Sequence, residues 1–265
     1  MIINTAITAF RENVFQYMYQ SGEFRIFGLS HLLGIFLFLI IVVALPILAK
    51  YKFNKSLQLQ IGKWLGWLVF ANYIAWVLLE IIGGSFDMKL HLPFHLCRMA
   101  NLLLPIVMLY RHKYTYEILY FWGLSGMFQG LITPDITNDF PHFHYFRFWL
   151  GHNGLIIALI YATVVYGMRP SMDGIKKAFI ALNVFFGVAI IANLILDANY
   201  FWICGKPPIA SLLDYMGPWP WYILSGEVVA LIHFGLAYLP FYILDKRNSV
   251  QESIDSTDQM EYSHG

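Results

Sequence analysis

Seven stretches of the sequence are long and apolar enough to cross a membrane as helices, and this constrains the fold more than any other feature. A helix needs roughly 20 mostly apolar residues to span the hydrocarbon of a bilayer. The stretches are residues 26–49, 60–82, 92–110, 116–133, 146–167, 177–196 and 222–244. We therefore predict an all-α, polytopic membrane protein with a bundle of about seven transmembrane helices, or six if residues 116–133 are re-entrant.

Composition supports the membrane class. Of the 265 residues, 58% are hydrophobic and only 12% are charged, whereas about 25% of the residues of a soluble domain are charged. The net charge of +1 says nothing about nucleic acid, and no basic patch suggests it, so we do not expect nucleic acid as a partner. No cleavable signal peptide is expected, because Arg11 and Glu12 interrupt the first apolar residues.

Basic residues in short loops predict the orientation, since lysine and arginine prefer the cytoplasmic side. One set of connections holds eleven of them: Lys50, Lys52, Lys55, Lys63, Arg111, Lys113, Arg169, Lys176, Lys177, Lys246 and Arg247. The other set holds five: Arg11, Arg25, Lys89, Arg147 and Lys206. We predict that the N-terminus lies outside and the C-terminus in the cytoplasm.

The two ends of the chain differ from the apolar region. Residues 1–25 mix aromatic and polar side chains, which favours a short helix lying in the membrane interface. Residues 245–265 are polar and acidic with few aliphatic side chains, which predicts a disordered cytoplasmic tail. Residues 26–244 would then form the transmembrane domain.

Polar side chains inside the apolar stretches gather toward the predicted outer side. The layer contains His31, Glu80, Cys97, Arg98, Gln129, His152, Asn153, Asn193 and Glu227. With a helical rise of 1.5 Å per residue, most of these groups lie roughly 3–10 Å below the outer boundary. Polar groups are costly in hydrocarbon, so such a layer predicts a functional site.

The third stretch carries the most reactive combination. Pro93 suits the first turn of a helix, and Cys97 and Asn101 would then share a face one turn apart. His95 and Arg98 lie on a neighbouring face. A cysteine near Arg98 and a histidine is in a setting that favours the thiolate. Such a thiolate with a histidine base is the minimum equipment for covalent acyl transfer.

Structural readings of the same residues remain open. Cys97 could be a small packing residue, or it could form a disulfide with Cys204, which falls on the same predicted side. The histidines could be helix contacts, and Glu80 and Glu227 could merely neutralise Arg98.

Functional alternatives remain open as well. His31, His152, Glu80 and Glu227 could bind zinc in a metal-dependent hydrolase, or the layer could be the pocket of a small-molecule receptor or transporter. No phosphate-binding glycine loop, HExxH or CxxC motif is present, and we predict neither a cofactor nor a metal.

Several blocks of sequence resemble those of the YwaF-like family of bacterial integral membrane proteins. They are HLPFHLCRMANLLLPIVML from His91, EILYFWGLSG from Glu117, LITPDIT from Leu131, FPHFHYFRFWLGHNGLI from Phe140 and LLDYMGPWPWYIL from Leu212. The resemblance covers about residues 25 to 244. That family is in turn distantly similar to a eukaryotic phospholipid acyltransferase with a cysteine nucleophile and a histidine.

The distant similarity implies roles for two residues. The cysteine of the LPxHLC block is Cys97, and the histidine that opens the HxGLI block is His152. It implies an integral membrane lipid acyltransferase or lipase whose partners are membrane phospholipids and lysolipids.

Around these two residues we expect eight supporting ones: Arg98, Asn101, His95, His31, Glu80, Asn153, Asn193 and Glu227. Arg98 would attract the lipid phosphate and Asn101 would donate to the oxyanion. Glu80 or Glu227 would orient His152 or balance Arg98.

Overall fold

The computed structural model of the chain describes residues 2–19, 23–208 and 211–263, which form helices joined by turns and loops, with an isolated bridge between Glu23 and Asn138. The α-helices are α1 (Ile2–Tyr19), α2 (Leu29–Lys52), α3 (Lys55–Gly83), α4 (Leu96–Tyr110), α5 (Lys113–Trp122), α6 (Phe128–Ile132), α7 (Phe143–Val164), α8 (Met172–Leu196) and α9 (Trp221–Ser263). A π-helical turn, η1 (Gly123–Met127), joins α5 to α6, and η2 (Tyr200–Trp202) and η3 (Leu212–Tyr215) are 3₁₀ helices.

Each predicted stretch falls largely on one of these helices or on the continuous run from α5 through η1 to α6. Four helical segments are long and apolar enough to span a membrane: α2, α3, α8 and residues Trp221–Ser249 of α9. The prediction of an all-α, multi-pass membrane protein is confirmed, whereas seven crossings and their orientation stay predictions.

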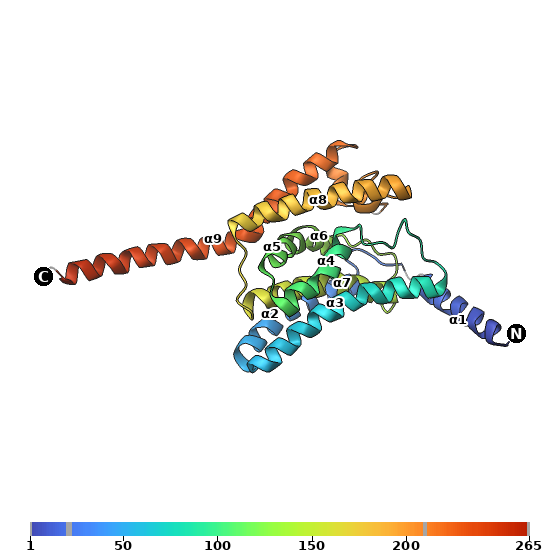
Figure 1. Cartoon of the computed structure of the whole chain (residues 1–265), viewed down its shortest axis with the longest axis horizontal. Coiled ribbons are helices and arrows are strands. Elements are labelled where there is room, and N and C mark those ends of the chain that lie inside the picture. Colours follow the sequence, from blue (N-terminus) through green and yellow to red (C-terminus); the bar gives the residue numbers. More distant parts are fainter. Residues whose placement is uncertain (1, 20–22, 209–210, 264–265) are drawn as a thin grey trace.

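The helices form two groups with a central layer between them (Figure 1). On one side α3 packs against α4 and α7, and α2 packs against α7. On the other side α8 runs beside the first part of α9, and α5 packs against α8. The far half of α9 projects away from the body, and α1 projects at the opposite end (Figure 1).

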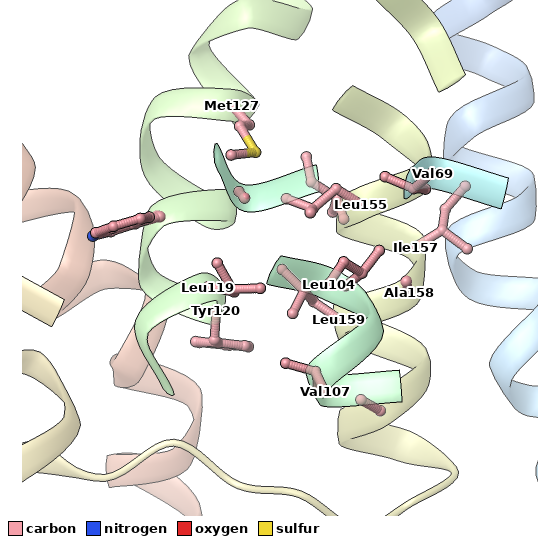
Figure 2. Close-up of a cluster of buried hydrophobic side chains, with 14 of the residues drawn as sticks. Val69, Leu104, Val107, Leu119, Tyr120, Met127, Leu155, Ile157, Ala158 and Leu159 are labelled. Atoms are coloured by element: carbon pink, nitrogen blue, oxygen red, sulfur yellow. The ribbon is translucent and has the colours of Figure 1, made fainter. Parts of the chain in front are cut away.

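The main hydrophobic core lies where α4, α5 and α7 meet. Leu104, Leu119, Leu155 and Leu159 point toward one another there, with Val69 reaching in from α3 (Figure 2). All five side chains are fully buried. This core fixes the position of α4 relative to α7, the two helices that carry the candidate site.

Small residues let α3 approach α4 closely. A Cβ atom added at Gly66 would lie 2.8 Å from Cβ of Met108, which is closer than real side chains come. A larger residue at this position would push the two helices apart, so the glycine sets their separation.

The start of α4 differs from the prediction. The helix begins at Leu96 with His95 as its N-cap, so Pro93 precedes the helix instead of lying in its first turn. The segment before it consists of turns and bends and is held by distant partners: Tyr73 donates to the His91 carbonyl at 2.9 Å, and the Tyr200 hydroxyl accepts from the Leu92 N–H at 3.0 Å. Cys97 is therefore the second residue of its helix.

The chain ends also bear on the predicted domains. α1 is the short helix expected in residues 1–25, and Arg11 Nε ties it to the Ile82 carbonyl at 3.1 Å; its place at the membrane interface stays a prediction. α9 continues as far as Ser263, through a segment where the sequence predicts a disordered tail. α9 continues there because adding residues to an existing helix costs far less free energy than starting a new helix.

Candidate active site

A cavity of about 680 Å³ lies between the two helix groups. Its polar lining includes Glu80, His95, Cys97, Arg98, Asn101, Gln129, Asp135, Arg147, His152 and Glu227. Its apolar lining, from α5, α8 and α9, includes Trp122, Leu182, Phe186, Ile223, Val229 and Phe234. The space therefore has a polar wall, mainly from α3, α4 and α7, facing a mainly apolar one.

Cys97 and His152 meet in this cavity. The half-buried Cys97 thiol, near the N-terminus of α4, lies close enough to the His152 imidazole on α7 for the two groups to interact. His152 Nδ1 lies 3.1 Å from the Phe148 carbonyl, so it carries the proton and donates it there. Nε2 is then the ring nitrogen left to interact with the thiol.

The imidazole is held by its own helix. It stacks on the Phe148 ring with centroids 4.1 Å apart and an interplanar angle of 22°. The orienting group is thus a backbone carbonyl and an aromatic ring, so the expectation that Glu80 or Glu227 orients His152 was wrong. The His152 ring is already bonded to its own helical turn and needs no carboxylate partner to orient it.

Asn101 ties the turn that carries Cys97 to α7. With its amide in the orientation that satisfies its neighbours, Nδ2 donates to the Gly151 carbonyl at 3.0 Å and to the Cys97 carbonyl at 3.2 Å. Both N–H donors are therefore occupied. Asn101 therefore positions the turn that carries Cys97. It is not placed to donate to an oxyanion, as the sequence led us to expect.

Two arginines contact one indole beside this pair. The guanidinium carbon of Arg147 lies 4.0 Å from the Trp76 ring centroid, and that of Arg98 lies 4.7 Å from it. Arg98 NH1 donates to the Leu92 carbonyl at 3.1 Å and to the Leu90 carbonyl. The sequence analysis missed Arg147 and counted it as a loop residue, although it lies five residues before His152 in the same block.

Two carboxylates of the cavity stand in different surroundings. Glu80 is buried; its Oε1 accepts from Trp76 Nε1 at 2.7 Å and its Oε2 accepts from the Ser85 hydroxyl. Asp135 is exposed to the cavity, yet the protein around it excludes enough water to raise the pKa of its carboxyl, an effect that Arg147 and Arg98 oppose. The sequence analysis did not single out Asp135.

Glu227, Gln129 and His95 also line the cavity. Glu227 Oε2 accepts from Asn183 Nδ2 at 3.1 Å, and the His95 ring packs against Tyr200 and Trp202. These three residues therefore lie around the same cavity as Cys97.

Three residues of the predicted layer do not line the cavity. His31 Nε2 donates to the Leu131 carbonyl at 2.9 Å and its Nδ1 accepts from the Phe27 N–H at 2.8 Å, so both nitrogens serve a structural contact. Asn193 bonds both the N–H and the carbonyl of Tyr200. Asn153 is buried, with its Oδ1 unpaired.

Two alternatives lose support. Cys97 and Cys204 are both free thiols, so no disulfide removes the candidate nucleophile. Among the described residues, no three histidine, cysteine or acidic side chains come together closely enough to hold a metal ion. The separation of His31 from the cavity accounts for part of this, because it was one of the four suggested zinc ligands.

Comparison with known protein families identifies the family of this chain. Residues 26–238 match the TMEM164 family. The chain belongs to the TMEM164 family. The match includes α2 to α8, the part of α9 that lines the cavity, and both Cys97 and His152.

A bacterial relative is also similar to this TMEM164 family member. An uncharacterized protein of Treponema pallidum (strain Nichols) is 27% identical over 150 residues, which cover 57% of this chain and 62% of the relative. The chain therefore spans less than two thirds of that relative's length. No solved structure matches the chain.

Proposed function

We propose that this TMEM164 family protein is an acyltransferase of membrane phospholipids that uses the Cys97 thiol as nucleophile. In this proposal the chain crosses the bacterial plasma membrane seven times, with its N-terminus outside. The resemblance of its sequence blocks to YwaF-like proteins, and through them to a cysteine-dependent phospholipid acyltransferase, agrees with this chemistry.

The observation that carries the proposal is the proximity of the Cys97 thiol and the His152 imidazole inside a large, mostly apolar cavity. A nucleophile beside a base that is itself oriented by a third group is the general signature of covalent catalysis. A cavity of about 680 Å³ is large enough for much of a lipid. Neither feature alone would distinguish a reactive thiol from a packing residue.

The proposed reaction has two halves, each a proton-balanced acyl transfer. Cys97 Sγ attacks the ester carbonyl of a phospholipid as its proton passes to His152 Nε2, and the ester C–O bond breaks. The proton then goes to the departing lysophospholipid oxygen. In the second half the hydroxyl of another lysophospholipid attacks the thioester, His152 takes its proton, and the Cys97 thiolate recovers that proton as it leaves.

The oxyanion formed in each half of the reaction would accept hydrogen bonds from backbone N–H groups at the start of α4. The first N–H groups of an α-helix lack acceptors within the helix and form a favourable site for negative charge. Those of Leu96 and Cys97 occupy the first two positions of α4. They take over the role that Asn101 cannot fill while its own donors are engaged.

Membrane depth agrees with this substrate class. In the proposed orientation α4 and α7 both begin at the outer side, so Cys97 and His152 lie just below the headgroups, where the esters of a glycerolipid are found. The apolar wall from α8 and α9 would then receive the acyl chain.

Cys97→Ala tests the proposal, and Cys204→Ala is the matched control because the chain has two cysteines. A thiol-reactive alkylating probe should label wild type and Cys204→Ala at one fast site that Cys97→Ala lacks. In proteoliposomes, transfer of an isotope-labelled acyl chain from phospholipid to lysophospholipid should be lost in Cys97→Ala and in His152→Ala. Cys97→Ala with unchanged lipid turnover would refute the mechanism.

Two other experimental outcomes would favour a different function. Stoichiometric zinc in the purified protein, with turnover abolished by a chelator, would indicate a metal-dependent hydrolase. A tightly bound small molecule in a protein that tolerates Cys97→Ser without loss of its activity would indicate a receptor or transporter.

A further inference from the structure

The two arginines on Trp76 form a feature that acyl transfer itself does not require. Guanidinium groups repel each other, and bringing two of them to one ring inside a protein needs compensation. Glu80 and Asp135 attract Arg147 across the cavity. Even so, the buried Nε of Arg147 has no hydrogen-bond partner among the described residues.

We propose that Arg98 and Arg147, held on the Trp76 indole, bind the phosphate of a lipid headgroup. A phosphodiester offers two charged oxygens, and guanidinium groups bind such oxygens through paired, charge-assisted N–H bonds. The unpaired Arg147 Nε supplies one such donor, and Arg98, whose NH1 is engaged by backbone carbonyls, has Nε and NH2 left for another.

The Trp76 ring that both arginines contact is fixed in place by hydrogen bonds. The Trp76 indole donates from Nε1 to buried Glu80, and Glu80 is itself held by the Ser85 hydroxyl. Asn72 Nδ2 donates to the Arg147 carbonyl at 3.0 Å, which fixes the backbone of the second arginine to α3. The two guanidiniums are thus positioned before any ligand arrives, which reduces the entropic cost of binding.

The site lies where a phospholipid bound for reaction would need it. Both arginines are close enough to Cys97 to act on its charge, and Arg98 is its neighbour in the chain. A phosphate on the arginines would therefore leave the glycerol esters beside the thiol. The inference rests on the proposed function and deepens it by naming the residues that bind the substrate's phosphate, but the binding site would exist even if Cys97 performed no chemistry.

Lipid binding, measured apart from turnover, tests the site. The full chain in detergent is titrated with phosphatidylglycerol and with diacylglycerol of the same acyl chains, and native mass spectrometry counts the bound lipid. Wild type should prefer the phospholipid. Arg147→Gln should weaken phospholipid binding roughly tenfold to a hundredfold, as expected for a lost charge-assisted bond, and leave diacylglycerol binding unchanged. Arg147→Lys should recover only part of the preference, because an ammonium cannot bind bidentately.

Arg111→Gln is the matched control. Its guanidinium lies 5.0 Å from the Tyr166 ring centroid, a similar arginine–aromatic contact, but Arg111 does not line the cavity. It should retain the phospholipid preference. Thermal melting of Arg147→Gln and Arg147→Lys shows whether each variant is folded, and the lysine variant keeps the test decisive if the glutamine variant is not.

The outcomes separate the anion site from the chemistry. A phospholipid preference that persists in folded Arg147→Gln and in folded Arg147→Lys would overturn the site, while thiol labelling of Cys97 would still stand. Loss of the preference in Arg147→Gln together with its retention in Cys97→Ala supports the site whatever the reaction. If inorganic phosphate binds wild type through Arg147 but phospholipid preference is unaffected by the substitution, the site is for free phosphate and the lipid assignment is wrong.

Discussion

Replacing Gly130 by alanine tests whether the His152 imidazole activates the thiol, without removing either group. A Cβ at this position would lie 3.2 Å from Cδ2 and 3.4 Å from Nε2 of His152. Optimal carbon contacts are about 3.5–4.0 Å, so the ring has to move by several tenths of an ångström. It has little freedom to do so, because Nδ1 is bonded to the Phe148 carbonyl and the ring is stacked on Phe148.

The expected loss can be worked from this displacement. A misplacement of about 1 Å costs an enzyme roughly 100-fold in rate. About half of that shift should reduce Cys97 reactivity and acyl transfer roughly tenfold, or about 1.4 kcal/mol in activation free energy. Gly130 lies inside α6, where alanine is more favourable than glycine by roughly 0.5–1 kcal/mol, so the fold should not be weakened.

The assay compares the rate of Cys97 alkylation with thermal melting in the same detergent. Gly187→Ala is the control, since Gly187 lies in α8 with nothing within 4 Å of the new methyl group. It should leave the alkylation rate unchanged. If Gly130→Ala alkylates at the wild-type rate while folded, then the imidazole beside it does not control the thiol, and the catalytic pairing is refuted.

Two further substitutions separate structural from functional members of the predicted polar layer. Asn193→Ala removes both hydrogen bonds to Tyr200 and should lower the free energy of unfolding by about 1–3 kcal/mol in a denaturation experiment, with Cys97 alkylation unchanged. His31→Phe leaves the Leu131 carbonyl and Phe27 N–H without their partner and should destabilise the fold by a similar, order-of-magnitude amount, about 1–3 kcal/mol. Slower alkylation in a folded form of either variant would assign that residue to the site instead.

The sequence predicted the helices well because apolar blocks of membrane length leave few other structures. It did less well at helix ends, which depend on distant partners. α4 starts at Leu96 because Tyr73 and Tyr200, from other parts of the chain, hold the residues before it in turns and bends. No local pattern around Pro93 encodes those contacts, so the prediction placed the helix start four residues too early.

The candidate site was predicted from the depth of each residue in the membrane. Some residues were wrongly included or missed because depth does not say which way a side chain points. Successive residues of a helix point about 100° apart, so groups at one level can face different neighbours. His152 faces the cavity, whereas Asn153, the next residue along α7, does not line it. Arg147 was missed for the opposite reason, since its basic charge was counted toward topology although its side chain reaches the cavity.

The cavity combines two kinds of wall that the fold keeps apart. Its reactive groups lie on α3, α4 and α7, whose mutual packing builds the buried core and holds Cys97 and His152 in register.

Its apolar wall includes α9, whose apolar segment is the least buried of the four candidate spans. Ile223, Val229 and Phe234 of α9 line the cavity while Leu224 and Val228 are exposed on the outside, so a single helix separates part of the cavity from its surroundings. Segments with few buried contacts open at lower free energy than a packed core. Movement of α9 would therefore admit a lipid chain without disturbing the geometry on which the thiol depends.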